Sequence, residues 1–258
     1  MLRSLYTATT GMIVQRNKMD NLTNNITNVD TIGYKKDYML TRSFDDVLIE
    51  RINDPNVIAT RYVPSGRNPV GDHNWGLYVD EVHTSFAQGA PEQTEQPNEL
   101  ALQGEGFFVV QTPQGDRYTR AGNFRVDSEG YLVNQDGYYV QSTAGGRVYV
   151  GNGEYTINAL GNVTVDGNMT DTISVVTFND LQGLRKDTDN LYYHYANEAP
   201  VPATDYQVLQ GYIETSNVSV ASEMVEMIAT SRAYETCYKA AQMIDQTLSK
   251  TVNDIARF

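Results

Sequence analysis

The sequence contains a single cysteine, Cys237, among its 258 residues. An internal disulfide is therefore excluded, and the chain suits either a reducing compartment or an exported protein that needs no covalent cross-link. Cys237 falls within a helical pattern, and free cysteine usually behaves as a small apolar residue. We expect it to be a buried or half-buried structural residue.

Long apolar runs are also missing. No stretch reaches the roughly 18 consecutive apolar residues that a membrane-spanning helix needs, so membrane insertion is not expected. Residues 1–19 lack both a continuous apolar core and a small-residue cleavage site, so they do not read as a cleaved signal peptide. Any passage out of the cytoplasm is expected to use another route.

Basic residues are few: 19 Lys and Arg stand against 32 Asp and Glu, which gives a net charge of −13. This balance argues against nucleic acid as a partner, because such binding depends on Lys and Arg releasing phosphate counterions. The acidic excess lies in the middle of the chain, whereas residues 1–36 and 218–258 are nearly balanced. An acidic body repels its own copies, so we expect association to run through the two ends.

Patterns that carry chemistry are scarce. The three histidines, His73, His83 and His194, are scattered, and no His or Cys pair has the spacing of a metal site. No Ser, Lys or Cys lies in a recognisable nucleophile motif. With 32 carboxylates, a pair at the separation that glycosidases use arises by chance. The sequence therefore predicts no catalytic residue, no cofactor site and no metal site.

Both ends of the chain show apolar residues at a period near 3.5, which is typical of coiled-coil seams. The first seam is interrupted at Thr9 and Arg16 and leads into the helix-stopping residues Asn28, Asp30 and Gly33. The second is regular and free of Gly and Pro over residues 218–256, enough for a helix of about 58 Å. The residues that we assign to an assembly interface are Leu5, Met12, Met19, Leu22, Ile26, Met224, Met227, Tyr234, Tyr238, Leu248, Val252 and Ile255.

Between the ends, short segments rich in β-branched and aromatic residues alternate with Gly, Asn and Asp turns. This spacing predicts antiparallel strands. Expected strands are Phe107–Gln111, Tyr131–Asn134, Tyr138–Gln141, Val148–Val150, Val163–Val165 and Ile173–Phe178. The predicted fold class is α+β, with a mainly antiparallel β central domain and long N- and C-terminal coiled-coil helices.

The composition divides the chain into four segments. We assign residues 1–36 to an N-terminal coiled-coil helix with its exit loop, and 37–74 to an extended connecting segment. Residues 75–210 form the β-rich central domain, and 211–258 form the C-terminal coiled-coil helix.

Three stretches carry a family resemblance. They are an Asn-rich run over residues 21–35, a central run from Gly104 to Val133, and a C-terminal run from Gly211 to Glu235. In these stretches the chain resembles the flagellar rod, hook and hook-filament axial proteins. It is most similar to the flagellar basal-body rod protein family, which includes the distal rod protein and its proximal-rod sister. Thr27 stands where the family usually has Ala.

The resemblance implies a structural subunit of the bacterial flagellar basal-body rod, which polymerises through its terminal helices to build the axial drive shaft. The implied partners are copies of the chain, other rod and hook subunits, and the flagellar export apparatus, with no nucleic acid. The implied location is the flagellum basal body, reached by type III export without a cleaved signal peptide.

Two other functions stay open on the sequence. One is a carbohydrate-binding or adhesin β module on a coiled-coil stalk, which has no need of both ends for assembly. The other is a hydrolase, which would show a deep pocket with a close carboxylate pair in the β body.

Overall fold

The computed structural model describes residues 2–52, 67–151, 153–196 and 198–255. The chain is α+β: one helix lies at each end, and the strands between them pair mostly antiparallel. It divides into two compact units. The first comprises Met1–Thr23, Met39–Val82 and Met224–Phe258, and the second comprises Asn24–Tyr38 and His83–Glu223.

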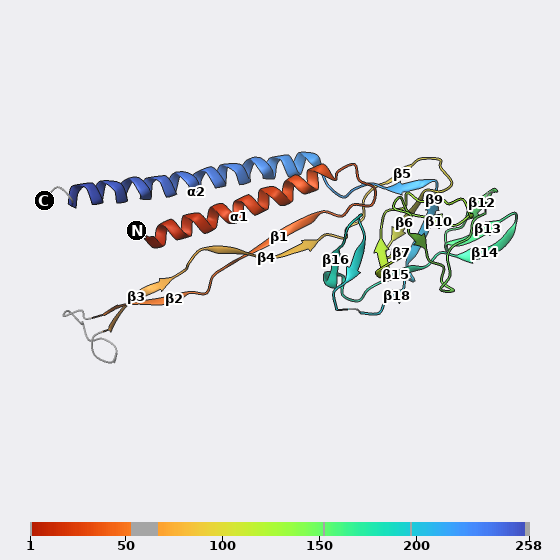
Figure 1. Ribbon diagram of the computed structural model, residues 1–258, viewed down its shortest axis with the longest axis horizontal. Helices are drawn as coiled ribbons and strands as arrows, with labels where there is room; N and C mark the ends of the chain where they lie inside the picture. Colours follow the sequence, from red (N-terminus) through yellow and green to blue (C-terminus); the bar gives the residue numbers. More distant parts are fainter. Residues whose placement is uncertain (1, 53–66, 152, 197, 256–258) are drawn as a thin grey trace. The chain divides into compact units, whose positions relative to one another are not determined.

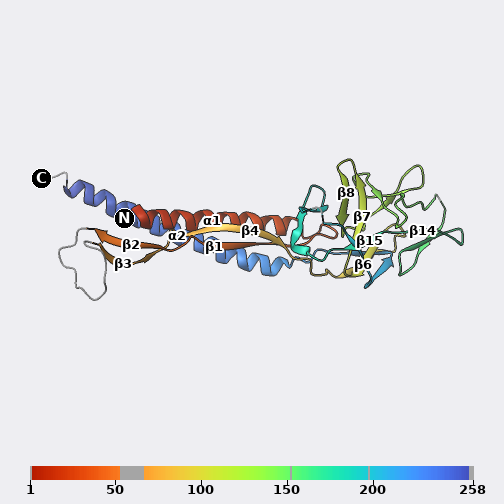
Figure 2. The ribbon, with the colours of Figure 1, turned by 90° about the horizontal axis from the view of Figure 1, so that it is seen from below.

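The first unit is built on helices α1 (Leu2–Thr27) and α2 (Val220–Ile255), which confirms the two predicted terminal helices. The helices run alongside each other in Figure 1, and in Figure 2, which is seen from below, α1 lies in front of α2. An ion pair of 2.7 Å joins Lys18 to Glu226. A Cβ atom added to Gly11 would lie 3.2 Å from Sγ of Cys237, so the absence of a side chain at Gly11 favours their close approach. Neither helix, as far as it is described, is long and apolar enough to cross a membrane.

A two-stranded ribbon completes the first unit. Strand β1 (Asp37–Ser43) pairs with β4 (Leu77–Thr84), and β2 (Val47–Ile52) pairs antiparallel with β3 (Arg67–His73). The ring of Trp75 meets that of Tyr6 edge-on, with centroids 5.9 Å apart, so the ribbon packs on α1. The segment that we read as an extended connection thus includes paired strands; its residues 53–66 lie outside the described residues.

The second unit holds the remaining strands. Its largest sheet has nine strands, in the order β16-β17-β8-β7-β11-β10-β9, with β15 pairing β7 and β18. Their bounds are β7 (Phe107–Thr112), β8 (Gly115–Thr119), β9 (Arg125–Val126), β10 (Leu132–Val133), β11 (Tyr139–Val140), β15 (Val175–Thr177), β16 (Leu184–Lys186), β17 (Tyr192–His194) and β18 (Val201–Pro202). A 3₁₀ turn, η1 (Leu181–Gly183), precedes β16.

Smaller sheets flank this one. Three strands, β12 (Tyr155–Ile157), β13 (Asn162–Val165) and β14 (Asn168–Thr172), form an antiparallel meander. Two antiparallel pairs bring distant parts of the chain together: β19 (Tyr206–Gln210) with β6 (Leu100–Gly104), and β20 (Tyr212–Glu214) with β5 (Pro91–Gln93). The chain just before α2 is therefore tied into the β unit.

Strand β7 is the centre of the β unit because both of its faces are buried. Side chains alternate along a strand, so Phe108 and Val110 enter the larger apolar cluster while Phe107 and Val109 enter a smaller one. The consecutive apolar residues of this strand are typical of a strand that is covered on both sides. The two clusters together form the core of the unit.

One predicted strand is wrong. Val148 and Val150 are fully buried, yet residues 148–150 make only an isolated bridge, between Tyr149 and Tyr131. The backbone of Val148 bonds to Leu132 and to Val140, on two different strands, so the segment builds no ladder with either. The apolar composition of residues 148–150 correctly predicted that they are buried, but it did not predict how their backbone bonds to the neighbouring strands.

Candidate assembly interface

The predicted seam residues of α1 are buried or half-buried. Leu22 is buried, and Leu5, Met12, Met19 and Ile26 are half-buried. The sequence reasoning missed Val14, which is buried with only 3% of its surface exposed. Val14 lies eight residues before Leu22, a spacing typical of an ordinary helix of period 3.6 and not of a strict 3.5 seam.

The predicted seam residues of α2 form two rows along the helix, here called flanks, one half-buried and one exposed. Met227, Tyr234 and Leu248 are half-buried. Met224, Tyr238 and Val252 are exposed by 51%, 49% and 64%, and they recur every fourteen residues along the helix. The side chain of Ile255 lies outside the described residues. The residues of this chain thus cover one flank of the seam and leave the other open.

A groove of about 710 Å³ lies within the first unit. The side chains that line it are mostly small: Arg3, Ser4, Thr7 and Ala8 of α1, Thr236, Cys237, Ala240 and Ile244 of α2, and His73 and Asn74 of the ribbon. Cys237 is half-buried, as the sequence predicted.

A buried ionic cluster lies in the second unit, where the exit loop of α1 meets the segment that leads into α2. Nζ of Lys35 is 2.6 Å from Oε1 of Glu214, and Nη1 of Arg120 is 3.4 Å from Oε2 of the same carboxylate. All three side chains are almost completely buried. Burial lowers the pKa of Lys35 and of Arg120, and the charge of Glu214 opposes both shifts. One carboxylate thus forms ion pairs with two buried cations.

A second ion pair extends this cluster to the first turn of α2. Nζ of Lys36 is 2.5 Å from Oε1 of Glu223, whose side chain is fully buried. Asn25 donates hydrogen bonds from Nδ2 to the carbonyl of Asp37, at 2.8 Å, and to Glu223, at 3.3 Å. Tyr34 donates from its hydroxyl to Oδ1 of Asn25. The Asn-rich stretch and the C-terminal stretch are therefore bonded to each other.

The exit loop depends on Gly33. Its φ of 67° is in the left-handed region, and a Cβ atom there would lie 2.5 Å from the amide nitrogen of Ala121. Its own amide donates to the carbonyl of Glu214 at 2.7 Å. Glycine is needed at this position for both the backbone conformation and the close approach.

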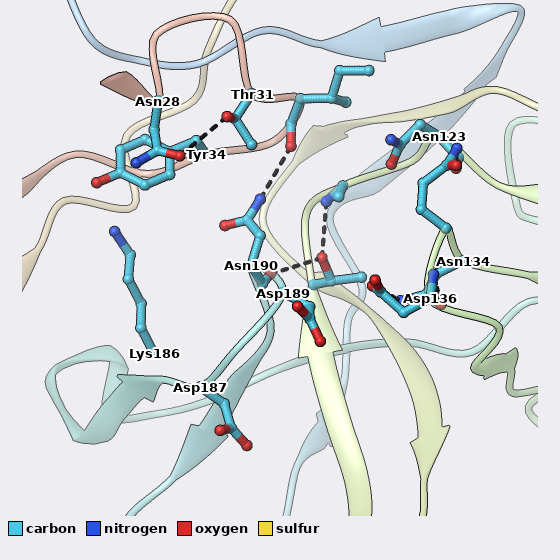
Figure 3. Close-up of a pocket in the computed structure, with 14 residues that line it drawn as sticks. Asn28, Thr31, Tyr34, Asn123, Asn134, Asp136, Lys186, Asp187, Asp189 and Asn190 are labelled. Carbon is cyan, nitrogen blue, oxygen red and sulfur yellow. Dashed lines mark hydrogen bonds between the residues drawn. The ribbon is translucent and has the colours of Figure 1, made fainter. Parts of the chain in front are cut away.

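Figure 3 shows a polar pocket of about 420 Å³ in the second unit. The exit loop of α1, the end of β8, a turn at 134–136 and the loop 186–190 line it. Asp136 and Asp189 lie on one side, and burial followed by the charge of Asp189 raises the pKa of Asp136. Asp187 is paired with Arg117 at 2.9 Å. The pocket gathers three carboxylates, Asp136, Asp187 and Asp189, whereas the hydrolase alternative requires a close pair of them in a deep pocket.

Among the residues that the structure describes, no group of three or more His, Cys, Asp or Glu side chains is placed to hold a metal ion. His194 stacks on Phe178, and His73 meets Trp75 edge-on. These histidines therefore have packing roles.

Three parts of the chain match known protein families. Residues 5–35 match "Flagella basal body rod protein". Residues 101–176 match "Flagellar hook protein FlgE/F/G D1 domain", and residues 209–255 match "Flagellar basal body rod FlgEFG protein C-terminal". The matched ranges contain the cluster residues Lys35, Arg120 and Glu214.

Curated relatives are similar over almost the whole chain. "Flagellar basal-body rod protein FlgG" of Bacillus subtilis is 31% identical, across 98% of this chain and 99% of the relative. "Flagellar hook-basal body complex protein FlhO" of the same organism is 32% identical, across the full length of both. "Flagellar basal-body rod protein FlgF" of Caulobacter vibrioides is 33% identical, across 100% of this chain and 98% of the relative.

Proposed function

Because the chain belongs to the flagellar basal-body rod protein family, and so is a structural subunit of the rod, we propose that α1 and α2 are the elements through which it polymerises. The observation that carries this proposal is the open flank of α2. Met224, Tyr238 and Val252 present exposed apolar or aromatic surface at heptad positions, where water contact is unfavourable. Contact with a neighbouring subunit would remove that surface from water.

The proposed contact is a coiled-coil seam shared between subunits. Leu5, Met12, Met19, Leu22 and Ile26 of α1, with Met227, Tyr234 and Leu248 of α2, form the flank that the chain covers itself. Met224, Tyr238 and Val252 form the flank that neighbours cover. The partners are copies of the chain and other rod and hook subunits, since the family assembles axial structures.

We also propose that the subunit reaches the rod through the flagellar export apparatus. A chain that travels unfolded must refold at its destination without covalent help. The single cysteine supports this route, because the chain has no internal disulfide to form or break.

A direct test is to purify basal bodies from cells and quantify the chain in them by mass spectrometry. The proposal expects it to co-purify in a fixed ratio with other rod subunits and to resist washing with high salt. Recovery of the chain only in the soluble fraction would overturn the assignment.

The rod function requires no enzymatic activity, and we propose that the polar pocket of Figure 3 carries none. None of the reported comparisons supports the adhesin alternative, and the relatives' names describe structural parts. Asp136→Asn is then expected to leave swimming speed within error of the wild type. The new amide keeps an oxygen that can accept from Asn134, which bonds to this side chain at 3.1 Å.

Swimming speed and the number of intact basal bodies per cell are the measurements. Asp136→Ala, which removes the acceptor oxygen as well, is the matched variant that separates the loss of a hydrogen bond from the loss of a charge. A non-motile Asp136→Asn strain with complete basal bodies would contradict the proposal and indicate that the pocket has a catalytic role.

A further inference from the structure

A second cavity of the β-rich second unit has a volume of about 330 Å³. Small-molecule sites in proteins commonly have volumes of about 300–1,000 Å³. We call this cavity the Arg120 pocket, and the residues of its wall that matter here are Phe86, Glu105, Phe107, Arg120, Thr177 and Leu181. Arg120 is also a member of the buried ionic cluster described above. The pocket therefore borders that cluster.

The guanidinium of Arg120 is buried, and the chain does not satisfy all of its donors. Only 4% of the residue is exposed. Nη1 is 3.4 Å from Oε2 of Glu214, and Nη2 donates to the carbonyl of Gly104 at 2.9 Å. Nε is also buried, and it has no hydrogen-bond partner among the described residues. A buried donor without an acceptor is costly, so this N–H favours an acceptor that enters the pocket.

The charges around Arg120 favour an anionic acceptor. Lys35 and Arg120 are both buried and share the single carboxylate of Glu214, which can balance only one of the two charges. Burial lowers the pKa of Arg120, and the charges of Glu214 and then Glu105 oppose that shift. Glu105 lines the pocket from an exposed position, where water weakens its attraction to Arg120. One positive charge of the cluster thus lacks a buried counter-charge.

Part of the pocket wall is aromatic. Phe107 is buried, and the guanidinium of Arg120 lies over its ring, 5.4 Å from the centroid. The ring of Phe86 meets that of Phe107 edge-on, with centroids 5.4 Å apart. Leu181 adds an aliphatic side chain to the same pocket. Apolar groups around a few fixed polar ones are typical of sites for small organic ligands, so the ligand is expected to have an apolar body.

We propose that the Arg120 pocket binds a carboxylate, which accepts a hydrogen bond from Nε of Arg120 while its apolar body contacts Phe107 and Leu181. Hydrogen bonds between a guanidinium and a carboxylate are stronger than those between neutral groups, because both partners are charged. The carboxylate belongs either to a free organic acid or to an acidic side chain of a neighbouring subunit. This site lies in a different part of the chain from the α1 and α2 contacts proposed above.

Calorimetric titration of the purified full chain with sodium benzoate, at constant ionic strength, tests the site. Benzamide is the matched probe, because it has nearly the same shape and carries no charge. Benzoate is expected to bind, and benzamide is expected to bind roughly ten-fold more weakly or not at all, since hydrogen bonds to charged groups are the stronger ones.

Three variants test the site without altering the ionic cluster. Thr177→Trp places a large ring in the pocket at a half-buried strand position and is expected to abolish benzoate binding. Thr164→Trp makes the same replacement at a half-buried strand position outside the pocket and is expected to leave binding unchanged. Glu105→Gln removes a like charge from the pocket wall and is expected to tighten benzoate binding roughly two- to five-fold. Circular dichroism verifies that each variant is folded.

The source of the carboxylate is separated in cells. If a neighbouring subunit supplies it, cells carrying Thr177→Trp are expected to hold fewer intact basal bodies than cells carrying Thr164→Trp. Equal numbers in the two strains identify a free acid as the ligand.

Three results would overturn the site and leave the rod function standing. They are no binding of benzoate by the wild-type chain, equal binding of benzamide, and unchanged binding of benzoate by folded Thr177→Trp. A lower melting temperature of Glu105→Gln without tighter benzoate binding would show that Glu105 itself serves Arg120, which also overturns the proposal. The rod function fails separately, if deletion of the gene leaves motility unchanged.

Discussion

Replacing Glu214 by glutamine is expected to lower the melting temperature of the purified chain by roughly 10 °C. Glutamine has nearly the same shape but carries no charge, so Lys35 and Arg120 would remain buried without the carboxylate that pairs with both of them. Removing one partner of a buried pair typically costs about 3–5 kcal/mol, because the remaining charge is left uncompensated. The measurement is thermal unfolding followed by circular dichroism.

Glu226→Gln is the matched control for this variant. Its pair with Lys18 is the same kind of interaction, but both side chains are exposed by more than a third. Its expected cost is below about 1 kcal/mol, which shifts the melting temperature by only a few degrees. Equal effects of the two substitutions would show that burial of the Lys35–Glu214–Arg120 cluster does not contribute to stability.

The substitution Tyr238→Asp is expected to abolish swimming while the chain remains folded. Tyr238 is 49% exposed in the single chain, so a carboxylate there costs the monomer little. In the proposed polymer the same position is covered by a neighbour, where an unpaired charge costs several kcal/mol. Swimming in soft agar reports the loss, and circular dichroism of the purified chain reports the folding.

Two further variants, Lys239→Asp and Tyr234→Asp, distinguish loss of an assembly contact from loss of helix stability in the monomer. Lys239 is exposed and lies about 100° around the helix from Tyr238, so its reversal is expected to reduce swimming far less. Tyr234 is half-buried within the chain, so Tyr234→Asp is expected to lower helix stability in the monomer as well. If the Tyr238→Asp strain swims normally, the open flank of α2 is not part of the assembly interface.

The sequence predicts the terminal helices well because their signal is local. The helix of residues 220–255 follows from heptad spacing without Gly or Pro, and the end of α1 follows from the Asn and Gly residues after it. The direction that each flank faces does not follow from periodicity. Met224 and Met227 fit one seam equally well, yet the first is exposed and the second half-buried, since that depends on where α1 packs.

The strands, like the helices, are predicted where the signal is local and missed where it depends on packing. The apolar run at Phe107–Val110 predicts a strand buried on both faces, and β7 is such a strand. Residues 148–150 have a similar composition, but their backbone bonds are divided between two other strands. Composition therefore reports burial, whereas pairing depends on neighbours that are far away in the sequence.

The buried ionic cluster is the part that sequence reasoning missed. Lys35 and Glu214 are 179 residues apart, and neither lies in a pattern that demands a partner. The available signal was that Lys35 ends the first stretch with family resemblance and Lys36 follows it, whereas Glu214 and Glu223 lie in the C-terminal stretch. That signal suggests a pairing but cannot show that it is buried.

The central claim is that the chain is a rod subunit that polymerises through its terminal helices. The most direct measurement is electron cryotomography of cells in which the gene is deleted and then restored, either as the wild type or as Tyr238→Asp. The account predicts rods that stop short in the deletion and Tyr238→Asp strains, and full-length rods with the wild-type gene. Full-length rods in the deletion strain would contradict it.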